Sequence, residues 1–252
     1  LLISSFSFSQ LSKEHYIPPI SSGPSNADPI EQYIYISTPS TGDVNFTINT
    51  IGATSVSGVV SNATPYVHTI AEEGYSSFVQ DPATTSRVIS DKGFIINADS
   101  PVYVSVRLNA GGYAQAGALV SKGENALGTT FRIGTYDNQG FPGGNYLNFF
   151  SFMATEDNTT VNLTNERVTS GLQIQNAGAQ QFPINNISLN RGQTYVVAVK
   201  PQDTDPNRNG LIGTLVSSNK PIVVNAGSAN GSFGDGGARD YGIDQIVELS
   251  KV

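Results

Sequence analysis

The chain has 252 residues, a formal net charge of −7 and only 13% charged residues, with 26 glycines, 13 prolines and no cysteine. Its lysines and arginines never cluster, and an acidic surface repels a phosphate backbone, which argues against nucleic-acid binding. The lack of cysteine excludes disulfides, thiolate zinc sites and cysteine catalysis. A surface built from Ser, Thr and Asn is typical of extracellular β-proteins, so we expect a secreted protein.

The N-terminal part of the chain predicts no helix. Residues 1–10 are apolar and rich in hydroxyls, and we interpret them as the remnant of a secretory signal peptide, with an edge strand as the alternative. Residues 11–29 carry the prolines Pro18, Pro19 and Pro24, which favour extended chain. We expect this lead-in to pack along the first β unit. No later stretch reaches the ~20 apolar residues that a membrane span needs.

Short β-rich runs follow one another from Gln32 onward, separated by glycine and proline. Val44, Phe46 and Ile48 alternate with polar residues, which predicts one buried and one solvated strand face. Strands that recur about every 8 to 12 residues are typical of an all-β sandwich or barrel. In chain order we expect strands at 33–37, 44–48, 56–60, 66–70, 77–80, 87–90, 94–97, 102–108, 118–121 and 131–135, then at 149–154, 160–164, 172–175, 187–189, 194–200, 211–217, 221–226 and 246–249.

The chain contains an internal repeat. Residues 93–106 read as a glycine, an apolar strand, a polar turn, a proline and a second strand, and this pattern returns in residues 213–226, with Pro101 and Pro221 120 residues apart. Upstream, residues 33–38 match 150–155, and residues 75–79 match 195–199. A repeat of this length indicates two copies of one folding unit.

We therefore predict an all-β fold of two tandem β-sandwich-like repeats, mostly antiparallel, at residues 30–146 and 147–252. In the first repeat, Lys122 is followed by the strand-like run 128–134, whereas in the second Lys251 is followed by a single valine. We accordingly predict that the second repeat is truncated at its C-terminus, which would leave an exposed sheet edge.

The sequence gives little support to catalysis. The two histidines, His15 and His68, lie in the lead-in and in an alternating strand, and neither belongs to a nucleophile motif. Carboxylates such as Glu72 and Glu73 are available for a glycosidase pair, but no spacing sets two of them at the required separation. We predict a protein that is not an enzyme.

Residues 202–210 hold the best metal candidate. Oxygen-bearing side chains alternate before Gly210, as at the opening of a calcium loop, but Val216 stands where the bidentate acid should follow. A polar hairpin loop is the alternative, and calcium is the one cofactor that the pattern allows. The candidate ligands are Asp203, Asp205, Asn207 and Asn209.

Two glycine-rich loops, at 109–117 and 227–244, occupy corresponding places in the two repeats. Loops on a rigid β scaffold commonly carry binding sites, and an aromatic platform there would favour a glycan. In the alternative, Arg239 and an aspartate merely hold the loop in place. The candidate ligand-binding residues are Tyr113, Phe233, Arg239, Asp240, Tyr241 and Asp244.

The stretches 189–195, 213–227 and 239–247, together with the lead-in, resemble the N-terminal module of IgG-Fc-binding-protein-like sequences. Within that group they are most similar to Bacteroidetes surface proteins tied to gliding motility, whose large chains commonly end in a type nine secretion sorting domain. The resemblance implies a non-catalytic, secreted, cell-surface adhesion or scaffold module. Its partners would be other domains of the same long chain and a surface glycan or protein ligand. The alternative is a carbohydrate-binding module or glycan-active enzyme with its site in loops 109–117 and 227–244.

Overall fold

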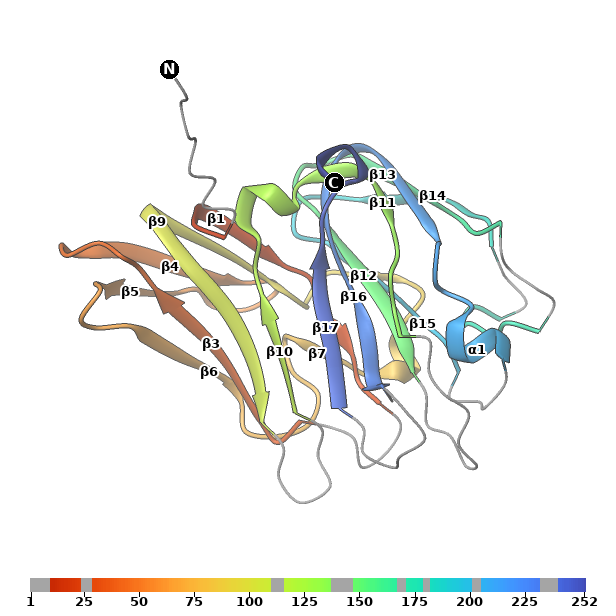
Figure 1. Ribbon diagram of the computed structural model, residues 1–252, viewed down its shortest axis with the longest axis horizontal. Helices are drawn as coiled ribbons and strands as arrows, with labels where there is room; N and C mark the ends of the chain where they lie inside the picture. Colours follow the sequence, from red (N-terminus) through yellow and green to blue (C-terminus); the bar gives the residue numbers. More distant parts are fainter. Residues whose placement is uncertain are drawn as a thin grey trace.

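The computed structural model describes residues 10–23, 29–109, 116–136, 147–166, 171–178, 182–200, 205–231 and 240–252. The predicted candidates Tyr113, Asp203, Phe233 and Arg239 lie outside these ranges. The described chain is nearly all β, and two antiparallel sheet bodies lie side by side (Figure 1). The predicted fold class is therefore confirmed.

The first body is a seven-stranded sheet and the second an eight-stranded one. The first contains β1 (Ser12–Ile17), β3 (Glu31–Ser37), β4 (Val44–Thr50), β5 (Val56–Val60), β6 (Tyr66–Ala71), β9 (Phe94–Asn109) and β10 (Gly117–Val120). The second contains β8 (Val88–Ile89), β11 (Gly128–Arg132), β12 (Asn148–Ala154), β13 (Thr159–Thr164), β14 (Ile184–Leu189), β15 (Thr194–Ala198), β16 (Leu215–Gly231) and β17 (Asp240–Ile246). A short parallel pair joins β2 (Ile20–Ser21) to β7 (Val79–Gln80), and the helical turns are η1 (Pro82–Thr84), η2 (Gly123–Ala126), α1 (Asp205–Asn209) and η3 (Leu249–Lys251).

The two bodies share one strand order. The first runs β5-β4-β9-β3-β6 and the second β14-β13-β16-β12-β15, with one extra strand, β8, beyond β15. β1 and β10 pair with the long strand β9, just as β11 and β17 pair with β16. β11 was assigned by sequence to the first repeat, 30–146, but it lies in the sheet of the second. The segment 11–29, treated as a lead-in, supplies β1 as a strand of the first.

The strand register corrects two details of the predicted repeat. Ile36 lies opposite Val104 and Phe152 opposite Val224, residues 120 apart, so Phe152 is the counterpart of Ile36. The sequence match had paired Ile36 with Met153, a one-residue slip that exchanges the two faces of a strand. Tyr66 faces Ile36 and Tyr195 faces Phe152, so the counterpart of Tyr195 is Tyr66 rather than Tyr75.

Each body has its own apolar core, and a third cluster joins them. Alternate residues of the strands point inward, as Ile34, Ile36 and Phe46 do in the first body, and all three are at most 2% exposed. Between the bodies lies a small cluster that includes Tyr16, Ile95 and Met153. The interface between the repeats is therefore a packed apolar interior that joins the two bodies.

The lead-in runs through this interface. Its prolines hold it extended and lack an N–H, and its carbonyl oxygens are bound by side chains of the second body. Ser151 Oγ donates to Pro19 O at 2.5 Å, Asn225 Nδ2 to Pro18 O at 2.9 Å, and Gln245 Nε2 to Tyr16 O at 3.0 Å. These side chains satisfy backbone groups that burial would otherwise leave unpaired.

Candidate functional site

The strand ends that flank the two loops predicted to carry a site lie side by side. β9 ends at Asn109 and β10 begins at Gly117, while β16 ends at Gly231 and β17 begins at Asp240. Tyr241 N donates to Ala116 O at 2.9 Å, which joins the starts of β10 and β17. The strand ends that flank both predicted loops therefore lie at one end of the molecule (Figure 1).

Of the predicted ligand residues, Asp240, Tyr241 and Asp244 are described, and all three lie on β17. Asp240 accepts a hydrogen bond from Ala116 N at 3.0 Å, and Asp244 forms an ion pair with Lys122 at 2.8 Å. Tyr241 is 5% exposed, belongs to the core of the first body, and accepts a hydrogen bond from Gly23 N at 3.3 Å. The Tyr241 ring is therefore not displayed at the surface. Asp244 is displayed there, with 65% of its side chain exposed.

A depression of about 210 Å³ lies beside these residues. Its floor consists largely of small residues in β16 and β17, and one side is formed by the chain that follows β11. Asp244 is its only charged lining residue among those described. The lining residues are Gly134, Thr135, Tyr136, Ala226, Gly227, Gly242, Ile243 and Asp244.

Tyr136 forms the aromatic side of this pocket. Its ring lies directly over two glycines: a Cβ on Gly242 would come within 1.4 Å of the Tyr136 hydroxyl, and one on Gly231 within 1.8 Å of the ring. Asn148 Nδ2 fixes the backbone by donating to Tyr136 O at 2.7 Å. Burial, and after it the negative charge of Asp240, raise the pKa of the Tyr136 hydroxyl, so it stays a neutral hydrogen-bonding group.

Thr135 contributes an unsatisfied polar atom at the same place. Its Oγ1 is buried and has no hydrogen-bond partner within the described part of the chain. Buried hydroxyls are normally hydrogen-bonded, so an unpaired one lining a pocket is a feature that a polar ligand can satisfy. Sequence analysis missed both Thr135 and Tyr136; the signal for them was the unusual density of glycine in the strands that they cover.

The calcium candidates lie elsewhere. Asp205–Asn209 form the short helix α1. Asn207 is buried, and its amide accepts a hydrogen bond from Gln173 N at 2.9 Å and donates to Lys200 O at 3.1 Å, so it ties α1 to the second body. No group of three or more His, Cys, Asp or Glu residues with metal-binding geometry occurs in the described ranges. Calcium binding by Asp203, Asp205, Asn207 and Asn209 stays a prediction.

A serine and a histidine meet inside the molecule. His15 Nδ1 lies 2.9 Å from Ser121 Oγ, and His15 Nε2 lies 3.1 Å from Val102 O and 3.2 Å from Ser12 O. Burial lowers the pKa of His15 to about 4. Both side chains are fully buried, so no substrate can reach this pair, and its contacts fasten β1 to the body.

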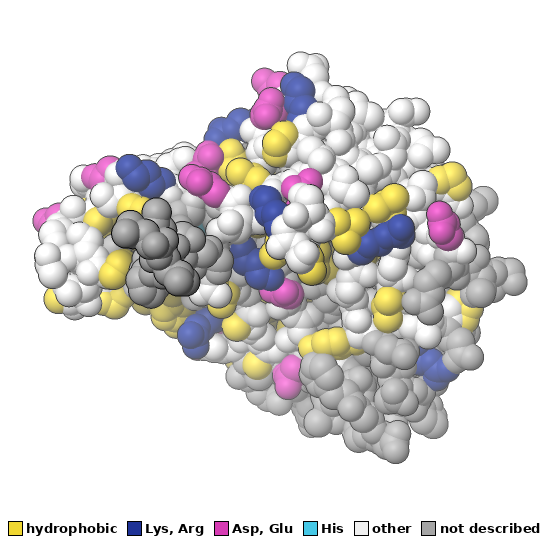
Figure 2. Space-filling view, turned by 45° about the horizontal axis from the view of Figure 1, so that its top comes forward, with side chains coloured by type: hydrophobic (Ala, Val, Ile, Leu, Met, Phe, Trp, Pro, Cys, Tyr) yellow, Lys and Arg dark blue, Asp and Glu magenta, His cyan; other side chains and the backbone are white. Residues whose placement is uncertain are grey.

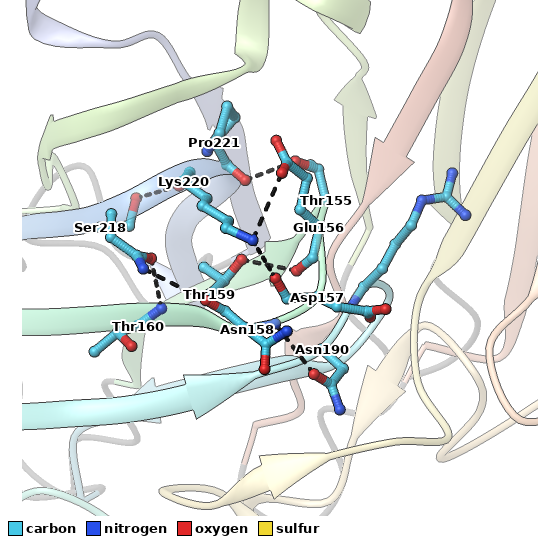
Figure 3. A network of polar contacts seen from close by, with 12 residues as sticks. Thr155, Glu156, Asp157, Asn158, Thr159, Thr160, Asn190, Ser218, Lys220 and Pro221 are labelled. Carbon is cyan, nitrogen blue, oxygen red and sulfur yellow. Dashed lines mark hydrogen bonds and ion pairs between the residues drawn. The ribbon is translucent and has the colours of Figure 1, made fainter.

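A polar network connects two turns of the second body to the middle of β16. Lys220 Nζ donates to Asp157 O at 2.6 Å, Arg191 N to Asp157 Oδ1 at 3.0 Å, and Thr160 N to Asn219 Oδ1 at 2.7 Å (Figure 3). These groups bind one another, and we interpret the network as structural. On the surface shown in Figure 2, basic and acidic side chains are interspersed without a large area of one sign, outside the grey atoms.

The comparison with known families decides where the chain belongs. A family model described as IgGFc binding protein matches residues 116–252, more than half of the chain. The chain belongs to the IgGFc binding protein family. No curated protein and no solved structure shows a significant match.

Membership in the IgGFc binding protein family indicates a binding module, as the resemblance implied. The matched segment runs from β10 to the end of the chain and so contains the whole pocket around Tyr136. Domains of this family are typically extracellular. Within the described residues, no helix has the length and apolar character required to cross a membrane.

Proposed function

We propose that the chain is a non-catalytic adhesion or scaffold module, secreted to the surface of a Bacteroidetes cell as part of a large gliding-motility-associated protein of the type nine secretion pathway. The family, the low charge content and the sequence resemblance support this proposal. The interior packing between the two repeats also supports it, because a rigid body holds a binding surface in a fixed orientation. Other domains of the same long chain would be its covalent partners.

The observation that carries the proposal is the pocket beside β17. It combines an aromatic side (Tyr136), an unpaired buried hydroxyl (Thr135) and an exposed carboxylate (Asp244) over a floor of glycines. An aromatic ring offers an apolar face to a sugar ring, while hydroxyl and carboxylate groups bind sugar hydroxyls. A surface glycan is therefore the ligand that we propose for this pocket. A protein ligand is the alternative, because concave pockets also receive protruding side chains.

The experiment is a glycan array probed with the labelled chain, with and without calcium. We expect binding to a subset of glycans, and we expect the Tyr136→Ala variant to bind at least about tenfold more weakly, a loss of about 1.4 kcal/mol. Tyr103→Ala is the matched control, because Tyr103 is also half-buried and lies on β9, outside the pocket. Equal binding by the two variants would exclude this pocket. A chain that binds bacterial surfaces but no glycan would point to a protein ligand instead.

A further inference from the structure

The second body includes a short strand, β8, that comes from inside the first repeat. β8 lies in the connection between β6 and β9 of the first repeat, and it pairs antiparallel with the outer edge of β15. Val88 lies opposite Tyr195, Ile89 lies opposite Thr194, and Ser86 N donates to Val196 O at 2.8 Å. β8 also contacts β14, so it lies between β14 and β15, which follow one another in the chain but are not paired with each other.

The first body has the equivalent two consecutive strands, β5 and β6, without an inserted strand. β5 and β6 are joined by the turn in which Ser61 N donates to Thr64 O at 3.2 Å, and they then diverge as the two ends of the sheet order. In the described ranges, no strand pairs with the outer edge of either one. The first body is accordingly a half-barrel, whereas the second is nearly closed.

Burial differs between β6 and β15, as expected if the space between β5 and β6 is open. All five residues of β15 are buried, and Tyr195 is only 7% exposed. Its counterpart Tyr66 is partly exposed, as is Ile70 on the same inward face. Val59 on β5 and Val67 on β6 are each 48% exposed on the opposite face. The inward-facing residues of β6 are thus less buried than the equivalent residues of β15.

The floor of this gap is already formed. Gly58 faces Phe46 in the first body, where Ile187 faces Val161 in the second, and a Cβ on Gly58 would lie 2.5 Å from the Phe46 ring. The Phe46 ring occupies this space and lies 4.8 Å from the ring of Tyr66. An incoming strand would therefore cover Tyr66, which is only partly buried beside the Phe46 ring, and gain backbone hydrogen bonds along an unpaired edge.

We propose that the gap between β5 and β6 is a strand-acceptor site, which binds an extended segment of another polypeptide with the chemistry of Ser86–Ser90. Such a segment has two adjacent β-branched apolar residues, preceded by Ser-Arg and followed by serine, and it adds to the edge of β6 as β8 adds to β15. The Val67 carbonyl would accept the hydrogen bond that the Val196 carbonyl accepts in the second body. Pro65 replaces Thr194, so the ladder would begin at Tyr66.

The test uses a synthetic peptide with the sequence of residues 84–92 and the intact chain, which contains no cysteine of its own. Extended by one residue, the β8–β15 register would place Arg87 opposite Val196, the counterpart of Val67. We therefore combine an Arg87→Cys peptide with a Val67→Cys chain and measure disulfide trapping in a thiol buffer. Val120→Cys is the matched control, because Val120 is a strand residue that is 42% exposed on β10.

We expect trapping to be at least about tenfold faster at position 67 than at position 120, and a peptide with Val88→Pro to lose this preference, because proline removes a strand hydrogen bond. With the unmodified peptide, hydrogen exchange should slow in β5 and β6. Equal trapping at both positions, or no slowing in β5 and β6, would overturn the proposal. Slower hydrogen exchange only in β14 and β15 would mean that the peptide replaces β8. A concentration-dependent dimer that protects β5 and β6 without peptide would assign the gap to a second copy of the chain. Either result overturns the proposal.

Discussion

The burial of His15 predicts how the free energy of unfolding changes at acid pH. The folded protein holds the pKa of His15 at about 4, whereas an unfolded histidine has a pKa of 6.5, because burial disfavours the charged ring. As the pH falls below 6.5, the unfolded chain takes up a proton that the folded chain does not. The free energy of unfolding therefore decreases by up to about 1.4 kcal/mol for each pH unit, and by about 3 kcal/mol in total at pH 4.

The second repeat suggests the substitution that removes this dependence. His15 lies opposite Ile96 and Phe131 lies opposite Val216, residues 120 apart, so the second body has a buried phenylalanine where the first has His15. A His15→Phe variant should keep the fold, since Ser121 Oγ and Lys122 N can still donate to Gln245 Oε1. It should lose the histidine part of the pH dependence.

The assay is urea unfolding of both proteins at pH 7.5, 6.5, 5.5 and 4.5, with the difference between them taken at each pH. Groups common to both proteins cancel in this difference, including the carboxyls of Asp99 and Glu248, whose pKa values hydrogen bonds lower. His68→Gln is a control for the other histidine, whose pKa is also lowered by burial. Parallel pH profiles for the wild type and the His15→Phe variant would refute the reasoning.

Two further substitutions test the packing, each by urea unfolding against a control substitution. Gly93→Ala should lower the free energy of unfolding by about 1 to 3 kcal/mol, because Gly93 has a φ of +100° and a Cβ there would lie 2.8 Å from Ile17 O. Gly134→Ala, the control, should be nearly neutral because the space around Gly134 is open. Equal effects of the two substitutions would contradict this. Ile89→Ala should cost about 2 to 4 kcal/mol, because Ile89 is 4% exposed against the second body, and Val88→Ala, at 39% exposure, should cost less than about 1 kcal/mol. A neutral Ile89→Ala would show that β8 is not held where we describe it.

The sequence predicted the architecture because its signal was regular. Alternation in strands such as 44–50 showed a buried face, and the repeat of Gly93 at Gly213 marked equivalent positions; both glycines have a positive φ. The register was harder to predict. Every residue of β12 is buried, because Met153 packs between the bodies while Phe152 packs in the core of its own. A strand with two apolar faces gives no alternation from which its register can be read.

The candidate site was predicted only in part. The sequence analysis placed a possible site in the loops at 109–117 and 227–244, and the strand ends that flank these loops lie together. Tyr241 had been proposed as a displayed aromatic residue, yet it is buried, because β10 and β17 bring it over Gly117. Tyr136 was missed because its neighbours Gly231 and Gly242 are far away in the chain. A pairing of this kind depends on tertiary contacts, which local patterns do not report.

The contribution of β8 to the neighbouring sheet has a practical consequence for anyone who dissects this chain. The family model begins at residue 116, and a fragment cut there would lack both β8 and the lead-in carbonyls that Ser151 and Asn225 bind. Such a fragment would expose the flank of β15 and leave the Ser151 hydroxyl and the Asn225 amide without these partners. We therefore expect the two repeats to unfold in a single transition. The boundary of the family match is then the wrong place to cut the chain.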